Sequence, residues 1–269
     1  HAVHRTDDGT AYSVVGAGEP VVLVHGVGMA QAVWKPQVDC LARKHQVIVY
    51  DLLGHGASRD PTPDVELADY ADQLVKLLDH LQVDQAAVIG HSMGSLITID
   101  FALRYRSRTR RIVAMNAVFE RSPEQSATVQ ERGRALRTPG ISSTLDATIA
   151  RWFGDPIPTP LIPSANMVRN LLAQVHPNGY ATAYSVFARS DAVHSQSLAQ
   201  LEVPALFMTG EFDPNSTPAM SRAMADRAPM GAYKQLDGAR HMMTLTSADR
   251  VNLVLQGFLA GDALAVDAP

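Results

Sequence analysis

The chain has 269 residues, 46% of them apolar, which is enough for one large hydrophobic core. Its formal net charge of −4 gives no electrostatic reason to expect nucleic acid or an anionic membrane as a partner. The single cysteine, Cys40, excludes an intrachain disulfide, which fits a reducing compartment or a fold that needs no disulfides. We see no signal peptide and no apolar run of about 18 residues, so we expect a cytoplasmic protein that does not span a membrane.

The first 118 residues alternate between short apolar runs and helical patterns. The apolar runs predict buried strands at 21–24, 46–50, 86–90 and 112–115. The helical patterns predict helices at 31–43, 66–81 and 93–105. Because this alternation is typical of a parallel sheet covered on both faces, we predict an α/β fold with a mostly parallel, doubly wound sheet.

The alternation stops at about residue 119 and resumes near 204. Between these points the sequence predicts helices around 124–137, 142–153 and 164–175, with a proline-rich stretch at 155–163. Beyond them it predicts strands at 204–209 and 231–236 and helices near 216–228 and 247–260. We therefore predict one core domain, residues 1–118 and 197–269, and a helical insertion, 119–196, lying over the end of the sheet. We expect the tail, 261–269, to be frayed.

A Gly-x-Ser-x-Gly pattern marks the junction between the strand at 86–90 and the helix that follows. Gly90, Ser92 and Gly94 lie where a buried strand must turn sharply, and such a turn holds the serine hydroxyl out above the sheet edge. The helix points its positive N-terminal end at that hydroxyl. The pattern is typical of an activated nucleophile, although on its own it also fits a purely structural turn.

A serine nucleophile needs a base, and the base needs an acid to orient it. Functional groups of parallel sheets gather at the carboxyl ends of strands, which directs attention to Asp213 and His241. Their order, Ser92, Asp213, His241, predicts a catalytic triad.

Alternatives for the acid remain open. Asp213 precedes a proline and fits a helix N-cap as well. Glu120, near the end of the strand at 112–115, is then the alternative acid, whereas Glu211 and Asp237 are less favoured.

An oxyanion hole requires two backbone N–H groups aimed at the developing negative charge. We predict Met93, which follows the nucleophile, and Val27, in the glycine-rich loop 25–28 after the first buried strand. That loop matches neither a dinucleotide-binding fingerprint nor a Walker motif, so it does not indicate nucleotide binding.

Three histidines near strand ends, His25, His55 and His91, raise the question of a metal. None shares ligand spacing with a cysteine or carboxylate, so we interpret them as hydrogen-bonding residues that shape loops. We predict no metal and no organic cofactor.

Taken together, these motifs closely resemble the α/β-hydrolase superfamily over about residues 10–260. The residues that carry the resemblance are the segments 25–28, 51–58, 90–94, 210–214 and 238–241. The resemblance implies that 119–196 is a helical cap. It also implies membership of the small capped bacterial group, which includes carboxylesterases, enol-lactonases and hydrolases that cleave carbon–carbon bonds in aromatic ring-fission products. The ring-fission hydrolases typically have Asn before the nucleophile and Trp after the histidine; His91 and Met242 stand here instead.

We therefore predict a serine hydrolase that cleaves a small carboxylic ester or lactone through an acyl-enzyme intermediate. The expected partner is this small-molecule substrate, and a homodimer stays open. Carbon–carbon, amide and peroxide chemistry are alternatives within the same fold. A non-catalytic binding protein is the alternative outside enzymes.

The insertion is expected to supply the walls of the substrate pocket. Four of its apolar residues are predicted to line that pocket: Trp152, Phe153, Met167 and Phe187. The insertion also holds arginines, and one turned inward would bind a substrate carboxylate. These arginines are Arg121, Arg132, Arg134, Arg137, Arg151, Arg169 and Arg189.

Overall fold

The computed structural model describes residues 2–136 and 145–262, and within them one eight-stranded sheet forms the centre of the molecule. Its strand order is β1-β2-β4-β3-β5-β6-β7-β8, antiparallel at β1–β2 and β2–β4 and parallel elsewhere. The strands are β1 (His4–Arg5), β2 (Ala11–Val15), β3 (Glu19–Val24), β4 (His45–Tyr50), β5 (Ala86–His91), β6 (Thr109–Met115), β7 (Ala205–Gly210) and β8 (Gly231–Leu236). The predicted mostly parallel α/β fold is confirmed; the sequence did not predict β1 and β2.

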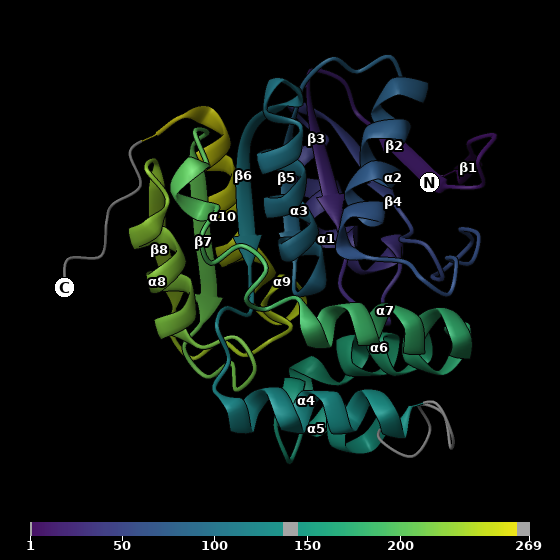
Figure 1. Ribbon diagram of the computed structural model, residues 1–269, viewed down its shortest axis with the longest axis vertical. Coiled ribbons are helices and arrows are strands. Elements are labelled where there is room, and N and C mark those ends of the chain that lie inside the picture. The colour runs from purple at the N-terminus through teal and green to yellow at the C-terminus, as the bar shows by residue number, and fades with distance from the viewer. Residues whose placement is uncertain (1, 137–144, 263–269) are drawn as a thin grey trace.

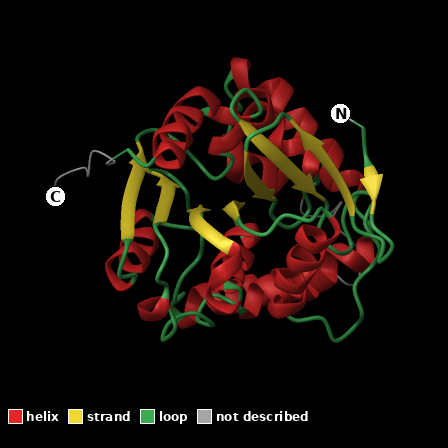
Figure 2. Cartoon of the chain, turned by 90° about the horizontal axis from the view of Figure 1, so that it is seen from above, coloured by secondary structure: helices red, strands yellow, loops and turns green. Residues whose placement is uncertain are grey.

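Helices cover both faces of this sheet (Figures 1 and 2). They are α1 (Lys35–Leu41), α2 (Leu67–His80), α3 (Met93–Arg104), α8 (Pro218–Arg227), α9 (Met243–Thr246) and α10 (Ala248–Ala260). Helix α2 packs against α3, and α1 packs against α10. Helix α2 buries Tyr70, Leu74 and Leu77 at helical spacing and begins with a capping box between Glu66 and Asp69. Helix α3 is buried on nearly every side, so it lies in the centre of the fold.

In the described parts of the chain between β6 and β7, four α-helices lie at the end of the sheet to which the parallel strands point (Figure 1). They are α4 (Pro123–Ala135), α5 (Leu145–Phe153), α6 (Ile162–Gln174) and α7 (Pro177–Arg189), and we call residues 119–196 the helical segment. Helix α4 packs against α7, and α5 against α6. The sequence did not predict α7. Arg137 and the first three residues of the predicted 142–153 helix lie outside the described residues, as does most of the tail.

A buried ion pair joins the two ends of the helical segment where it leaves the sheet. The Arg121 guanidinium lies 3.1 Å from an Asp191 carboxylate oxygen, and the Arg121 backbone N–H donates to the other oxygen at 2.8 Å. The same guanidinium stacks on the ring of Phe187, 4.6 Å from its centroid. A second backbone bond, Glu120 N–H to Asp191 C=O, lies beside this pair. The first and last turns of the segment are therefore tied to each other beside the ends of β6 and β7.

The turn between β5 and α3 has no room for larger residues. A Cβ placed on Gly90 would lie 2.2 Å from the Gly94 carbonyl oxygen, and one on Gly94 would lie 2.1 Å from the Val24 carbonyl oxygen. Ser92, between them, adopts φ 57° and ψ −120°, a conformation that costs a non-glycine residue free energy. This close packing of helix on strand fixes where Ser92 sits.

We expect Gly94→Ala to lower the free energy of unfolding by about 2 kcal/mol or more, because the clash is with backbone atoms that cannot move aside. Gly133→Ala is the matched control, since its Cβ would meet only two Tyr184 ring carbons, at 3.4 and 3.7 Å. That change should stabilise α4 by about 0.5–1 kcal/mol. Urea unfolding of both variants measures this, and equal effects would contradict the packing described.

Candidate active site

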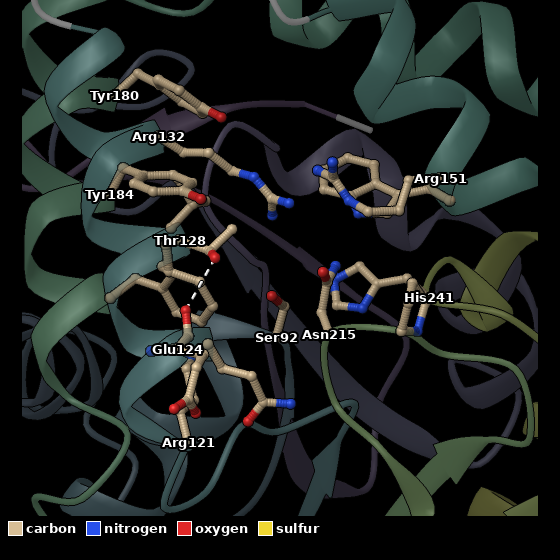
Figure 3. A pocket seen from close by; sticks show the side chains of 16 residues that line it. Ser92, Arg121, Glu124, Thr128, Arg132, Arg151, Tyr180, Tyr184, Asn215 and His241 are labelled. Atoms are coloured by element: carbon tan, nitrogen blue, oxygen red, sulfur yellow. Dashed lines mark hydrogen bonds between the residues drawn. The ribbon is translucent and has the colours of Figure 1, made fainter.

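Ser92 lies between the carboxyl end of β5 and the first turn of α3. Its backbone N–H donates to the Met115 carbonyl of β6 at 2.9 Å. The Ser95 hydroxyl is close to two carbonyls, those of Gly90 at 2.9 Å and Met115 at 2.7 Å. These bonds fasten the turn to two strands. The Ser92 side chain points into a cavity between the sheet and the helical segment (Figure 3).

Asp213 and His241 follow β7 and β8, and the structure brings them into contact. His241 Nδ1 lies 2.7 Å from Asp213 Oδ2. That oxygen also accepts from Asn116 Nδ2 at 2.8 Å, and Oδ1 accepts from the backbone N–H of Asn215 at 2.8 Å and of Ser216 at 3.2 Å. The carboxylate is thus buried, and every described contact of its oxygens is with a donor.

Burial alone would raise the pKa of Asp213. The charge and hydrogen bond of His241, with the hydrogen bonds from Asn116 and the Asn215 backbone, outweigh burial and hold the pKa below its usual range. The carboxylate is therefore ionised at neutral pH, which orients the His241 ring with a proton on Nδ1.

The N-cap interpretation of Asp213 and the alternative acids can be compared with the contacts that these residues make. The N-cap of α8 is Thr217, whose side chain accepts from the Met220 N–H, so the N-cap interpretation of Asp213 is wrong. Glu120 instead pairs with Arg227, at 2.6 and 2.8 Å, in a half-exposed position. Glu211 accepts from the backbone N–H of Gly238.

Two aromatic residues hold the His241 ring from different sides. His91 Nε2 lies 2.8 Å from the His241 carbonyl oxygen and donates to it, with the two ring centroids 5.0 Å apart. The indole of Trp152, from α5, stacks on the His241 ring at 5.3 Å with an interplanar angle of 28°. The ring is thus fixed by a carboxylate, its own backbone and a flat apolar surface.

The loop 25–28 packs directly against Ser92. A Cβ on Gly26 would lie 3.0 Å from the Ser92 Cβ, so a larger residue there would press on the serine. The buried His55 ring accepts from the Gly28 N–H at 2.9 Å through Nε2 and donates to the Leu53 carbonyl at 3.0 Å through Nδ1. Val27 lines the cavity beside Ser92. Met93 begins α3, and the first N–H groups of a helix have no partner within it.

The cavity has a volume of about 260 Å³, which suits a small molecule. Ser92 and His241 line it together with loop and helical-segment residues. The others are Val27, Arg121, Glu124, Gln125, Thr128, Val129, Arg132, Arg151, Trp152, Tyr180, Tyr184, Phe187, Pro214 and Asn215.

The predicted pocket residues divide into two pairs. Trp152 and Phe187 line the cavity, whereas Phe153 and Met167 do not. Phe153 is only 2% exposed, because it points about 100° around α5 from Trp152 and packs into the core. Met167, on α6, packs partly buried against the same core. Asn116, Tyr180 and Tyr184 were not predicted, since nothing in their local sequence marks them.

Among residues 2–136 and 145–262, no group of three or more His, Cys, Asp and Glu side chains could hold a metal ion. No helix in the same ranges is long and apolar enough to cross a membrane. The three predicted loop-shaping histidines each contact a backbone group: His25 with Leu52 N–H, His55 with Gly28 N–H and His91 with His241 C=O.

The sheet, the strained serine turn and the residues after β7 and β8 define an α/β hydrolase. A family model for the alpha/beta hydrolase fold matches residues 19–248, and the chain belongs to that family. The resemblance identified from the sequence is confirmed.

Several proteins to which the chain is similar are hydrolases by name. An (E)-2-((N-methylformamido)methylene)succinate hydrolase of Acinetobacter baylyi is 34% identical over 92% of this chain and 93% of its own. The crystal structure of an enol-lactonase from Burkholderia xenovorans LB400 is 26% identical, covering 96% of this chain and 100% of that one, with a TM-score of 0.88. A malate-bound thermophilic esterase from Thermogutta terrifontis is 26% identical over 94% and 93% of the two chains, with a TM-score of 0.85. These similarities support hydrolase activity.

Buried histidines make the stability of this fold depend on pH. Burial lowers the pKa of His55 to about 3, of His91 to about 3 and of His194 to about 4. In the unfolded chain the pKa is near 6.5, so the unfolded state takes up these protons first. Protonation of these histidines therefore does not weaken the fold above about pH 6.5. The free energy of unfolding declines as the pH falls below about 6.5 toward the lower pKa values of the folded state.

We expect the free energy of unfolding, measured in urea, to fall steadily between about pH 6.5 and 4.5. His194→Gln removes one of these titrating side chains, so the free energy of unfolding should fall less steeply with decreasing pH over the same range. A stability that stays flat in wild type across this range would contradict the buried, neutral state of these rings.

Proposed function

We propose that this protein is a serine hydrolase in which Ser92, His241 and Asp213 form a catalytic triad. The observation that carries the proposal is the 2.7 Å contact between His241 Nδ1 and Asp213 Oδ2 behind a histidine that lines the same cavity as Ser92. Because Nδ1 carries a proton and donates a hydrogen bond to Asp213, Nε2 is left as the acceptor for the Ser92 proton.

The proposed reaction is acyl transfer in two stages. Ser92 Oγ attacks the substrate carbonyl while His241 accepts its proton, and the same histidine then donates that proton to the leaving group. Asp213 remains ionised and stabilises the charged imidazole. The backbone N–H groups of Val27 and Met93 are proposed to stabilise the oxyanion. Water then hydrolyses the acyl-enzyme by the reverse sequence of proton transfers.

The bond cleaved is proposed to be a small carboxylic ester or lactone. The enol-lactonase and esterase similarities support this assignment. The name of the Acinetobacter baylyi relative describes a formamido compound, which favours an amide as the second candidate. All three bonds present an acyl carbonyl to the nucleophile, so one triad and one oxyanion hole serve each of them.

The helical segment, 119–196, is proposed to act as the lid over a core domain of 1–118 and 197–269. Two observations support this role: Trp152 stacks on His241, and α4, α5 and α7 supply most of the cavity lining. A lid with these contacts excludes water from the reacting groups and sets which substrates fit.

Turnover of a panel of short esters, lactones and N-acyl enamines tests the proposal. Ser92→Ala and His241→Ala should each lower kcat by about 10⁴-fold or more, and Asp213→Asn by about 10⁴-fold. Glu120→Gln is the matched control for Asp213→Asn, since Glu120 pairs with Arg227 away from the cavity, and its kcat should equal that of wild type.

Two results would overturn the proposal. Absence of any turnover by wild type across the panel would favour a binding protein on this fold. Turnover that persists in Ser92→Ala would assign the chemistry to another residue.

A further inference from the structure

The cavity is also lined by side chains that take no part in the proposed acyl transfer. Arg132 extends from α4 and Arg151 from α5, and both line the cavity. Their guanidinium groups point toward one another across it, above Ser92 (Figure 3). Two cations that face each other repel, and the repulsion is strong where water is displaced. The arrangement therefore favours the binding of an anion between the two arginines.

The other described arginines of the helical segment have partners. Arg121 pairs with Asp191, Arg134 with Glu131 and Arg169 with Asp146. Arg189 donates to the Val65 carbonyl. Within residues 2–136 and 145–262, no carboxylate forms an ion pair with Arg132 or Arg151. In the described structure the Arg151 guanidinium makes one long hydrogen bond, 3.4 Å, to the Thr148 hydroxyl.

Unpaired donors accumulate at the same place. The Arg151 Nε and the Trp152 indole N–H are both buried with no hydrogen-bond partner in the described structure, although the two residues are neighbours on α5 and both line the cavity. Arg121 Nη2 is likewise buried with no hydrogen-bond partner in the described structure. Buried donors are normally satisfied, so three unsatisfied donors around one cavity indicate an acceptor-rich ligand.

The carboxylate of Glu124 also lines the cavity but does not neutralise the arginine pair. It is exposed, lies on the side of Arg121 (Figure 3), and has its pKa lowered chiefly by a hydrogen bond with Ser122. Burial and the charge of Arg132 lower the pKa of Arg151, which fits a cation held near a second cation. A bound carboxylate would offset both the burial of Arg151 and its repulsion by Arg132. It would also accept hydrogen bonds from the guanidinium groups in the geometry that they favour.

We propose that Arg132 and Arg151 bind a carboxylate of the substrate, so that the enzyme acts on acyl compounds that carry a negative charge away from the scissile bond. The inference rests on the proposed function, because the cavity is taken as the acyl-binding site. Hydrolysis of a substrate with this charge on its acyl part releases a dicarboxylate. One carboxylate of that product would remain beside Ser92 and the other would lie between the two arginines.

Product binding tests this inference without requiring turnover. The probes are the dicarboxylates from malonate to adipate and their diamides, titrated into Ser92→Ala by calorimetry. At least one dicarboxylate should bind about tenfold or more tightly than its diamide. Adding Arg132→Gln or Arg151→Gln should weaken that binding by about tenfold or more, because each removes a charge-assisted hydrogen bond.

Arg134→Gln is the matched control, since Arg134 is on the same helix as Arg132 but pairs with exposed Glu131. It should leave the affinity unchanged. Arg151→Lys keeps the positive charge but lacks the planar, bidentate donor geometry of a guanidinium. It should therefore lose less affinity than Arg151→Gln. Melting temperatures establish that each variant is folded.

Equal binding of every dicarboxylate and its diamide would overturn the inference, as would equal effects of Arg132→Gln and Arg134→Gln. Neither result would affect ester turnover by wild type, which tests the proposed function separately. Conversely, dicarboxylate binding that depends on both arginines, in a protein without turnover, would support an anion-binding cavity and count against the catalytic proposal.

Discussion

The strained backbone at Ser92 is the constraint on which the site depends. A residue with φ 57° between a buried strand and a buried helix persists only because its surroundings fix it. Here Gly90 and Gly94 let α3 approach the β3 and β5 backbones, while bonds from Ser92 and Ser95 to the Met115 carbonyl fasten the turn to β6. The packing energy of the core thus holds one hydroxyl at the sheet edge.

The parallel sheet then brings the remaining groups to that edge. Asp213 and His241 follow neighbouring strands, β7 and β8, so residues far apart in the sequence are in contact. Asn116, at the end of β6, supports the carboxylate from a third strand. The Arg121–Asp191 pair joins the two ends of the helical segment, and α5 of that segment places Trp152 on the His241 ring.

Much of this arrangement could be predicted from the sequence because it depends on local pattern. Apolar runs followed by glycine and polar residues mark the ends of parallel strands, and these positions include Ser92, Asp213 and His241. The remaining features depend on tertiary packing. Strand β2 alternates weakly and pairs antiparallel with β4, so no apolar run marks it. Trp152 and Phe153 are equally apolar, and only the rotation of α5 decides that one faces the cavity and the other the core.

We propose above all that the turn at residues 90–94 presents an activated nucleophile. Reaction with a fluorophosphonate, followed by mass spectrometry of the digested protein, tests it most directly because the probe reports the residue that attacks. We expect one adduct, on Ser92, which is absent in Ser92→Ala and forms far more slowly in His241→Ala. An adduct on another residue, or equal labelling of wild type and Ser92→Ala, would contradict it.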